Sequence, residues 1–148
     1  MQPSVELPPP PAARPPSSTR VLVVDDDPDV RAVLGRMLDK AGYRVVEAEH
    51  GRAALARIAE ARPDLILLDL MMPEMDGFDF LDELRRGEGA RGIPIVVVTA
   101  KDLTADDHRR LNGSVERILQ KSALDRDALL AEVGELVSES VKRRKAGG

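Results

Sequence analysis

Acidic side chains follow two of the apolar runs in this chain. Asp25, Asp26 and Asp27 come directly after the run at residues 21–24, and Asp69 comes directly after the run at residues 65–68. Carboxylates that crowd together repel one another, so some must take up protons unless a cation joins them. Mg²⁺ prefers oxygen ligands, usually one or two carboxylates with waters and phosphate oxygens. If the two acidic segments meet in the fold, they predict a magnesium site.

Two further polar residues follow later apolar runs. Thr99 ends the run at residues 95–98, and Lys121 follows a short run at residues 115–119. A carboxylate beside Mg²⁺ can attack phosphorus and form an aspartyl phosphate. Lys121 and the metal would spread the charge of the transferring group, and Thr99 could donate a hydrogen bond to it. The set of residue types favours phosphoryl transfer onto an aspartate.

Short apolar runs alternate with segments of helical spacing. The runs are too short for amphipathic helices and are rich in Val, Ile and Leu, which predicts strands. We expect strands at residues 21–24, 44–48, 65–68, 95–98 and 115–119. We expect helices at 28–41 (with Asp27 as cap and Val33 among its inward residues), 51–61, 77 onward, 105–111 and 125–141 (with Asp125 as cap).

Strands that alternate with helices through short connections imply a parallel sheet with right-handed crossovers. We therefore expect an α/β fold, a doubly wound sheet of five strands in the order 2-1-3-4-5 with five helices. In such sheets ligands bind at the carboxyl ends of the strands, where the strand order reverses. The first and third expected strands flank that point, and they lead into Asp25 and Asp69.

Composition excludes several classes of function. The chain has 148 residues, room for one domain, and its net charge of −4 gives no support to nucleic-acid binding. The absence of Cys excludes disulfides and thiolate metal sites. No apolar run approaches the roughly 20 residues that span a bilayer, and the N-terminus has no signal-peptide pattern. We expect a cytoplasmic protein with no membrane partner.

The two ends of the chain differ from its middle. Residues 1–19 are rich in proline and should form a disordered leader, because they cannot bury enough apolar surface to offset the entropy of ordering. Residues 20–141 should form the folded domain. Residues 142–148 form a basic tail, whose cations suit the end of the final helix.

Four motifs together resemble the response-regulator receiver domain of two-component signalling. They are VLVVDDDPDVR, LILLDLMMPEMDG, VVVTA and LQK, in this order. The resemblance covers about residues 20–140 and implies a flavodoxin-like fold. It also implies a role for each matching position: Asp25 and Asp26 organise Mg²⁺, Asp69 is the phosphoacceptor and a metal ligand, Met71 gives the metal a backbone carbonyl, Thr99 is the switch hydroxyl, and Lys121 contacts the phosphoryl group.

The resemblance implies a signalling domain and not an enzyme with an external product. A histidine kinase or a histidine phosphotransfer protein would supply the phosphoryl group, and a conformational change would reach an unknown downstream protein. Nothing after the last helix could form an output domain, so we expect a free-standing receiver. The stretch at residues 111–133 looks more like receivers attached to hybrid kinases than like receivers fused to DNA-binding domains, and no nucleic-acid partner is expected.

Two positions depart from the pattern of the family. Ile118 stands where many members carry an aromatic that turns inward on phosphorylation, so a Thr–aromatic switch is not expected. Ser122 stands where a proline, often after a cis bond, follows the lysine. A cis bond before a residue other than proline costs about 2.5–4 kcal/mol, so we expect the Lys121–Ser122 bond to be trans.

The positions around the acceptor also suggest how long the phosphoryl group stays. By family position, Met71 and Lys101 border the approach of water, and neither can orient it as a general base would. We therefore expect slow loss of the phosphoryl group. By the same resemblance, the output face should comprise the helix at 105–111, the strand at 115–119 and the last helix, and the helix at 105–111 should be its mobile element.

Two other classes of function remain open. A haloacid-dehalogenase-type phosphatase also uses Mg²⁺ and an Asp-x-Asp motif, which Asp25 and Asp27 satisfy. That class needs Thr or Val where Asp29 stands, a nucleophile on the first strand and a cap domain. The third class is a pseudo-receiver that acts only as a scaffold, against which the complete set of acidic, hydroxyl and lysine positions argues.

Overall fold

The structure is a computed structural model that describes residues 19–72, 76–86, 92–100, 102–113, 115–123 and 125–147. The proposed leader, apart from Thr19, lies outside the described residues, as does Lys101. The side chains of residues 140–147 also lie outside the description. The boundary of the leader and the role of Lys101 therefore stay predictions.

Five parallel strands form one sheet in the order β2-β1-β3-β4-β5, which confirms the expected α/β fold and strand order. The fifth strand begins two residues later than expected. The Val115 N–H donates to the carbonyl of Leu111 at the end of the preceding helix, so this residue still belongs to the turn. The strands are β1 (Arg20–Val24), β2 (Arg44–Ala48), β3 (Leu65–Leu68), β4 (Ile95–Thr99) and β5 (Arg117–Gln120).

Helices follow the strands at the expected places, and several begin at the expected caps. The Asp27 carboxylate accepts the Asp29 N–H, and the Asp125 carboxylate accepts the Ala128 N–H. Such bonds satisfy donors that the first turn of a helix leaves unpaired. The helices are α1 (Pro28–Lys40), α2 (Gly51–Glu60), α3 (Gly77–Arg86), α4 (Ala105–Leu111) and α5 (Arg126–Gly147), with a short 3₁₀ helix, η3 (Lys121–Ala123), after β5.

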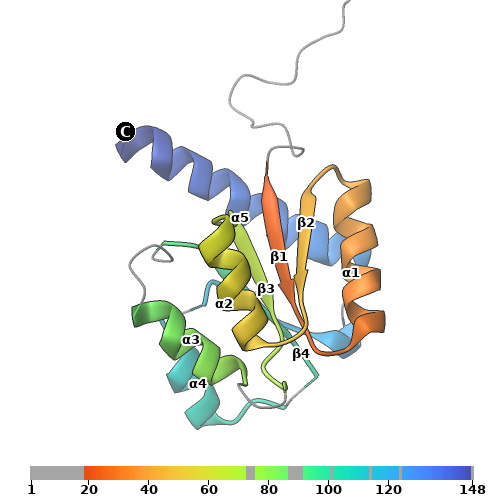
Figure 1. Cartoon of the computed structure of the whole chain (residues 1–148), viewed down its shortest axis with the longest axis vertical. Coiled ribbons are helices and arrows are strands. Elements are labelled where there is room, and N and C mark those ends of the chain that lie inside the picture. Colours follow the sequence, from red (N-terminus) through yellow and green to blue (C-terminus); the bar gives the residue numbers. More distant parts are fainter. Residues whose placement is uncertain are drawn as a thin grey trace, which may run out of the picture.

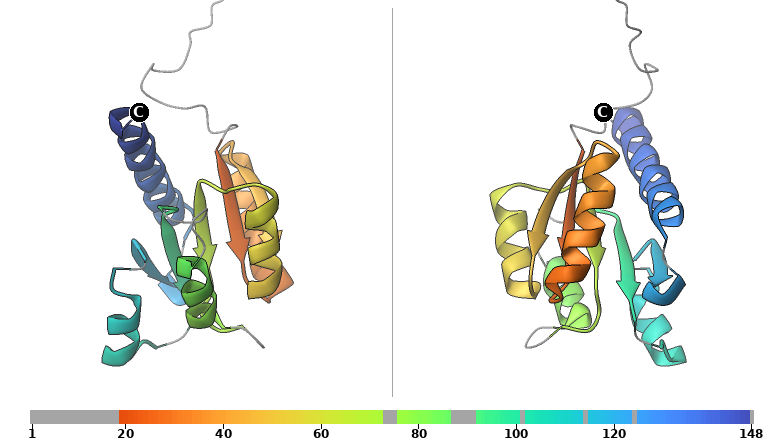
Figure 2. Two further views of the ribbon diagram at one scale, coloured as in Figure 1. Left: turned by 60° about the vertical axis from the view of Figure 1, so that its left-hand side comes forward. Right: turned by 90° about the vertical axis from the view of Figure 1, so that its right-hand side faces the viewer.

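Helices cover both faces of the sheet (Figure 1). Side chains alternate between the two faces along a strand. Leu22 and Val24 of β1 lie in a cluster with residues of α2, α3 and α4, whereas Val21 and Val23 lie in a second cluster with residues of α1 and α5. Figure 2 shows the sheet and the helices around it from two further sides. The core is mainly aliphatic, as the composition predicts, and Phe80 is its largest fully buried side chain.

One inward residue of α1 was predicted wrongly. Val33 is exposed, whereas Leu34 and Leu38 are buried against the sheet. These two leucines are one turn apart and define the face of α1 that packs against the sheet. Val33 lies beside that face and is therefore exposed.

The last helix continues past residue 141 and takes in the basic tail, whose cations were expected at the end of this helix. Backbone of helical conformation continues through Gly147, so the basic run lies within α5. Among the described residues, no helix has the length and apolar character needed to cross a membrane.

Candidate functional site

The acidic segments meet at the carboxyl ends of β1 and β3. These strands are direct neighbours, with Val24 opposite Leu68 in the register. The Asp69 N–H donates to the carbonyl of Val24 at 2.9 Å, and the Asp25 N–H donates to the carbonyl of Ala48 at 3.1 Å. The two aspartates therefore leave the sheet side by side, at the point where the strand order reverses.

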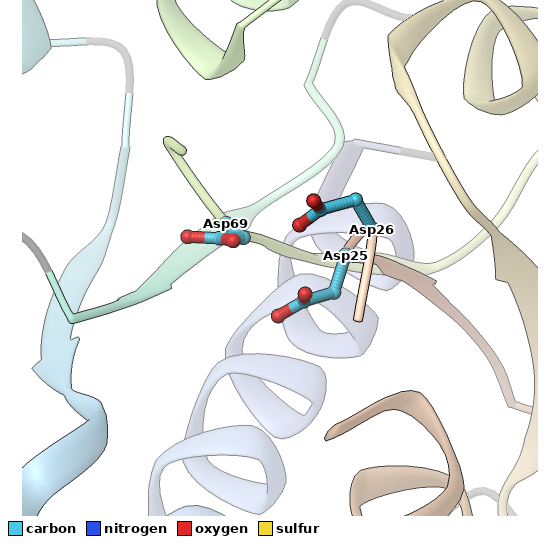
Figure 3. Close-up of side chains that lie close together, drawn as sticks. All are labelled: Asp25, Asp26 and Asp69. Carbon is cyan, nitrogen blue, oxygen red and sulfur yellow. The ribbon is translucent and has the colours of Figure 1, made fainter. Parts of the chain in front are cut away.

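Asp25, Asp26 and Asp69 form the acidic cluster that the sequence predicts (Figure 3). Each offers one carboxylate oxygen, and these oxygens all lie within 4.8 Å of one another. Asp25 is 2 % exposed and Asp69 4 % exposed, whereas Asp26 is exposed to solvent. A hard divalent cation takes such oxygen ligands, so the donor set fits Mg²⁺.

Lys121 reaches the same cluster from the far end of β5. Its Nζ lies 2.7 Å from Oδ2 of Asp25 and 3.4 Å from Oδ2 of Asp69. Lys121 opens η3, and the Lys121–Ser122 bond is trans, as predicted. The 3₁₀ turn therefore brings the lysine to the acidic cluster without a proline at position 122.

Two groups of this site have raised pKa values, one mainly through burial and the other through its charged partners. Burial raises the pKa of the Asp69 carboxyl and the nearby charge of Asp25 adds to this, against the Met71 N–H and the Lys121 ammonium. Burial by itself would lower the pKa of Lys121, but the hydrogen bonds and charges of Asp25 and Asp69 outweigh it and raise that pKa. One ammonium thus does not fully compensate the buried carboxylates, and a divalent cation would supply the missing charge.

Replacing Asp69 with the neutral Asn should stabilise the metal-free fold. Because the pKa of Asp69 is raised, the folded state holds its proton more tightly than the unfolded state. Ionised Asp69 therefore lowers stability as the pH rises through the folded pKa. We expect Asp69→Asn to raise the free energy of unfolding at pH 7 by about 1 kcal/mol. Urea unfolding in EDTA measures this.

The control is to measure the stability difference between wild type and Asp69→Asn as a function of pH. At a pH where Asp69 is protonated in both states, wild type and Asp69→Asn should unfold at nearly the same urea concentration. A stability difference that stays constant from pH 7 into that acidic range would contradict an electrostatic cause.

Thr99 and Met71 lie near Asp69 in different ways. Thr99 ends β4, the neighbour of β3, and is fully buried. The Met71 N–H donates to Oδ1 of Asp69 at 3.2 Å, and Met71 is 54 % exposed. The expected roles of the Thr99 hydroxyl and the Met71 carbonyl stay predictions.

Gly77 lies in close contact with the backbone of Asp69 and Leu70. Its N–H donates to the carbonyl of Leu70 at 3.1 Å. A Cβ at this position would lie 2.7 Å from Cα of Leu70 and 2.9 Å from the carbonyl oxygen of Asp69. Both contacts are with backbone, so only glycine lets α3 begin this close to Asp69 and Leu70.

Arg31 is a residue of this region that the sequence reasoning missed. Its Nη1 donates to the carbonyl oxygen of Asp25 at 2.7 Å, and its Nε lies 3.2 Å from Oε1 of Glu47 in β2. The position of Arg31 in the sequence could have indicated such a contact. A cation one turn from the N-terminus of a helix interacts unfavourably with the helix dipole, so its presence there suggests a specific partner.

Ile118, which stands where many family members carry an aromatic residue, lies at a hollow between α4 and β5. Ile118 is partly buried there and packs against the cluster that contains Leu111. The hollow has a volume of about 520 Å³ and is lined in part by His108, Leu111, Val115 and Ile118. No Phe, Tyr or Trp side chain of the described residues lines it.

Comparison with known proteins agrees with this geometry. The family model of the response regulator receiver domain matches residues 21–134. The response regulator MprA of Mycolicibacterium vanbaalenii is 40% identical over 123 residues, which cover 82% of this chain and 52% of that protein. The DNA-binding regulator RpaA of a Synechocystis strain is 36% identical over 76% of this chain and 46% of its own length. The chain thus spans about half the length of these curated relatives.

Solved structures show the same fold. The chemotaxis protein CheY4 of Vibrio cholerae superposes with a TM-score of 0.74 at 30% identity, covering 80% of this chain and 98% of that one. The receiver domain of a histidine kinase from Syntrophus aciditrophicus superposes with a TM-score of 0.73 at 29% identity, covering 82% of this chain and 91% of that one. With the acidic cluster at the switch point of the sheet and the family model across most of its length, this chain belongs to the family of response regulator receiver domains.

Proposed function

We propose that this domain accepts a phosphoryl group on Asp69 from a histidine kinase or a histidine phosphotransfer protein. The observation that carries the proposal is the place of the Asp69 carboxylate. It is almost fully buried, lies within 4.8 Å of the Asp25 and Asp26 oxygens, and lies 3.4 Å from the Lys121 ammonium. Membership of the receiver family supports a signalling role, and we propose that the domain turns over no external substrate.

In the transfer step, an oxygen of Asp69 forms a bond to phosphorus while the bond from phosphorus to the donor's imidazole nitrogen breaks. Asp25 and Asp26, with the carbonyl of Met71, would hold Mg²⁺, which supplies positive charge to the transferring oxygens. Lys121 already lies beside the acceptor oxygen and would stabilise the negative charge of the phosphoryl group. Thr99, at the end of β4, would donate its hydroxyl to the bound group.

The signal would leave through α4, β5 and α5 to a downstream protein. In α4, the buried set consists of Leu111 alone, so few contacts hold this helix to the core. Segments with few buried contacts open at low free-energy cost. With Ile118 in place of an aromatic, the change at Thr99 would act on α4 through aliphatic packing. We expect the protein to act in the cytoplasm, without a nucleic-acid or membrane partner.

Acetyl phosphate and Mg²⁺ test the proposal without a cognate kinase. Stable labelling of Asp69, mapped by mass spectrometry, supports a receiver. Sustained hydrolysis of several phosphoesters would instead support the phosphatase alternative. A protein that neither takes the label nor turns over phosphoesters would be a scaffold, and the proposal would be wrong.

The phosphoryl group should be lost slowly, and Met71 should contribute to that. Its side chain is exposed beside the acceptor and carries no group that could orient water. We expect Met71→Asn to shorten the half-life of the labelled protein, by about tenfold if the amide orients the water in part. The measurement is decay of the label in excess Mg²⁺. Met71→Leu is the matched control and should keep the slow decay.

Lys101 is the second residue expected to border the approach of water to the phosphoryl group. Its role is inferred from its position in the sequence alone. A Met71→Asn, Lys101→Glu double variant should lose the label faster than either single variant. Decay in the double variant that equals wild type or is slower would show that these side chains do not control the access of water.

A further inference from the structure

Arg31 connects three segments around the acidic cluster. It lies one turn into α1, where its own N–H donates to the carbonyl of Asp27. Its guanidinium extends back to the loop between β1 and α1, at the carbonyl of Asp25, and sideways to the carboxylate of Glu47. The Arg31 side chain is 17 % exposed. An arginine held in this way has one preferred geometry, because its planar fork is already shaped for two partners.

The contacts of Asp25 show what the guanidinium adds. The Asp25 N–H donates to the carbonyl of Ala48 at 3.1 Å, and its carboxylate accepts the Asp27 N–H at 2.9 Å and pairs with the Lys121 ammonium at 2.7 Å. The Asp25 carbonyl lies past the end of β1, and Arg31 donates to it at 2.7 Å. A charge-assisted bond of this length is among the stronger hydrogen bonds in proteins.

The carbonyl of Asp25 belongs to the same rigid plane as the N–H of Asp26. A donor that fixes this carbonyl therefore fixes the direction in which the chain reaches Cα of Asp26. Asp26 is the exposed member of the cluster, so packing restrains it least. The orientation of this one peptide plane decides whether the Asp26 carboxylate meets those of Asp25 and Asp69.

We infer that Arg31, oriented by Glu47, is a positioning residue that holds the Asp25–Asp26 peptide and so assembles the metal site. For its effect on Mg²⁺ the inference rests on the proposed function. For its effect on the loop it does not. Glu47 acts through Arg31, because its carboxylate bonds Nε and leaves Nη1 directed at the Asp25 carbonyl.

The charge of Arg31 and its positioning role predict opposite changes of Mg²⁺ affinity when Arg31 is replaced, so the inference can be tested. Arg31 is a cation close to the cluster, and like charges repel, so removal of its charge by itself should strengthen Mg²⁺ binding. Loss of positioning should weaken Mg²⁺ binding. Residues that orient metal ligands typically change metal affinity by about 10- to 100-fold when they are replaced. We expect Arg31→Ala to weaken Mg²⁺ binding by about tenfold.

The experiment has two arms on the full chain. Amide hydrogen exchange of the metal-free protein reports the loop at Asp26 and Asp27. In the second arm the protein is titrated with Mg²⁺. The NMR chemical shifts of backbone amides, recorded at each Mg²⁺ concentration, give the dissociation constant. Arg36→Ala is the control for loss of an exposed cation from the same helix and should leave both readouts unchanged. Arg31→Lys should show a partial loss, because an ammonium keeps the charge but does not span both partners.

Glu47 supplies an independent variant if Arg31→Ala fails to fold. Glu47→Gln should accelerate exchange at Asp26 and weaken Mg²⁺ binding, whereas Glu49→Gln, the matched control for loss of a nearby negative charge, should do neither to the same extent. In the Arg31→Ala background Glu47→Gln should have little further effect, because the partner through which it acts is gone.

Faster exchange together with weaker Mg²⁺ binding in Arg31→Ala and Glu47→Gln supports the inference. Mg²⁺ binding that is equal to wild type or tighter overturns it, whether or not the exchange rate changes. If the wild-type protein binds no Mg²⁺, the proposed metal site is wrong. The exchange arm then decides by itself whether Arg31 holds the loop.

Discussion

Asp69→Asn should abolish labelling by acetyl phosphate while the protein stays folded. Asn keeps the shape of the side chain and its place after β3, but an amide oxygen is a poor nucleophile and cannot give an aspartyl phosphate. One alternative acceptor in the cluster is Asp25, but its carboxylate already pairs with Lys121 at 2.7 Å and accepts the Asp27 N–H. We therefore expect loss of the label to below the detection limit in intact-mass spectra.

The controls separate chemistry from folding. Asp39→Asn makes the same chemical change on the exposed face of α1 and should label at the wild-type rate. The unfolding measurement on Asp69→Asn, which should show equal or greater stability, excludes a misfolded variant. An undiminished label on Asp69→Asn, mapped to another residue, would show that the acceptor is not Asp69.

Asp26→Asn should have the second largest effect, through the metal. Asp26 is exposed, so its replacement leaves the buried pair of Asp25 and Lys121 intact and should cost little stability. The variant loses one of the three carboxylates whose oxygens lie within 4.8 Å of one another. We expect the Mg²⁺ concentration for half-maximal labelling to rise by about 10- to 100-fold, with a nearly normal rate at saturating Mg²⁺.

Two controls complete this test: removal of Mg²⁺ by a chelator and replacement of a neighbouring aspartate. EDTA should stop labelling of the wild-type protein. Asp29→Asn makes the same change of charge in the first turn of α1 and should shift the Mg²⁺ requirement much less. An equal shift in Asp29→Asn would mean that the metal responds to net charge alone. A normal Mg²⁺ requirement in Asp26→Asn would remove Asp26 from the ligand set.

The sheet and its order could be predicted because the pattern repeats along the chain. Each short apolar run is followed by a cap or turn residue and a helical segment, and a parallel sheet is the arrangement that buries all the runs. Errors arose where neighbours decide the outcome. Whether Val115 belongs to β5 depends on its bond to Leu111, and whether Val33 faces the core depends on how α1 rotates against the sheet.

The sequence by itself determined which chemical groups stand at the ends of the strands. Asp25 and Asp26 after β1, Asp69 after β3 and Thr99 at the end of β4 are local facts, because a strand of known length ends at a known residue. Parallel strands end at one edge of the sheet, so the meeting of these groups followed from the order of the strands.

Only the tertiary structure decided how the charges are shared. Lys121 stands far along the chain, and the turn of η3 brings its Nζ to 2.7 Å from Asp25 and 3.4 Å from Asp69. The burial of Asp25 and Asp69 beside the exposed Asp26, and the bond from Arg31 to the Asp25 carbonyl, are likewise set by packing. Hydrogen bonds and pKa values depend on differences of tenths of an ångström and on solvent access, and these are properties of the packed elements together.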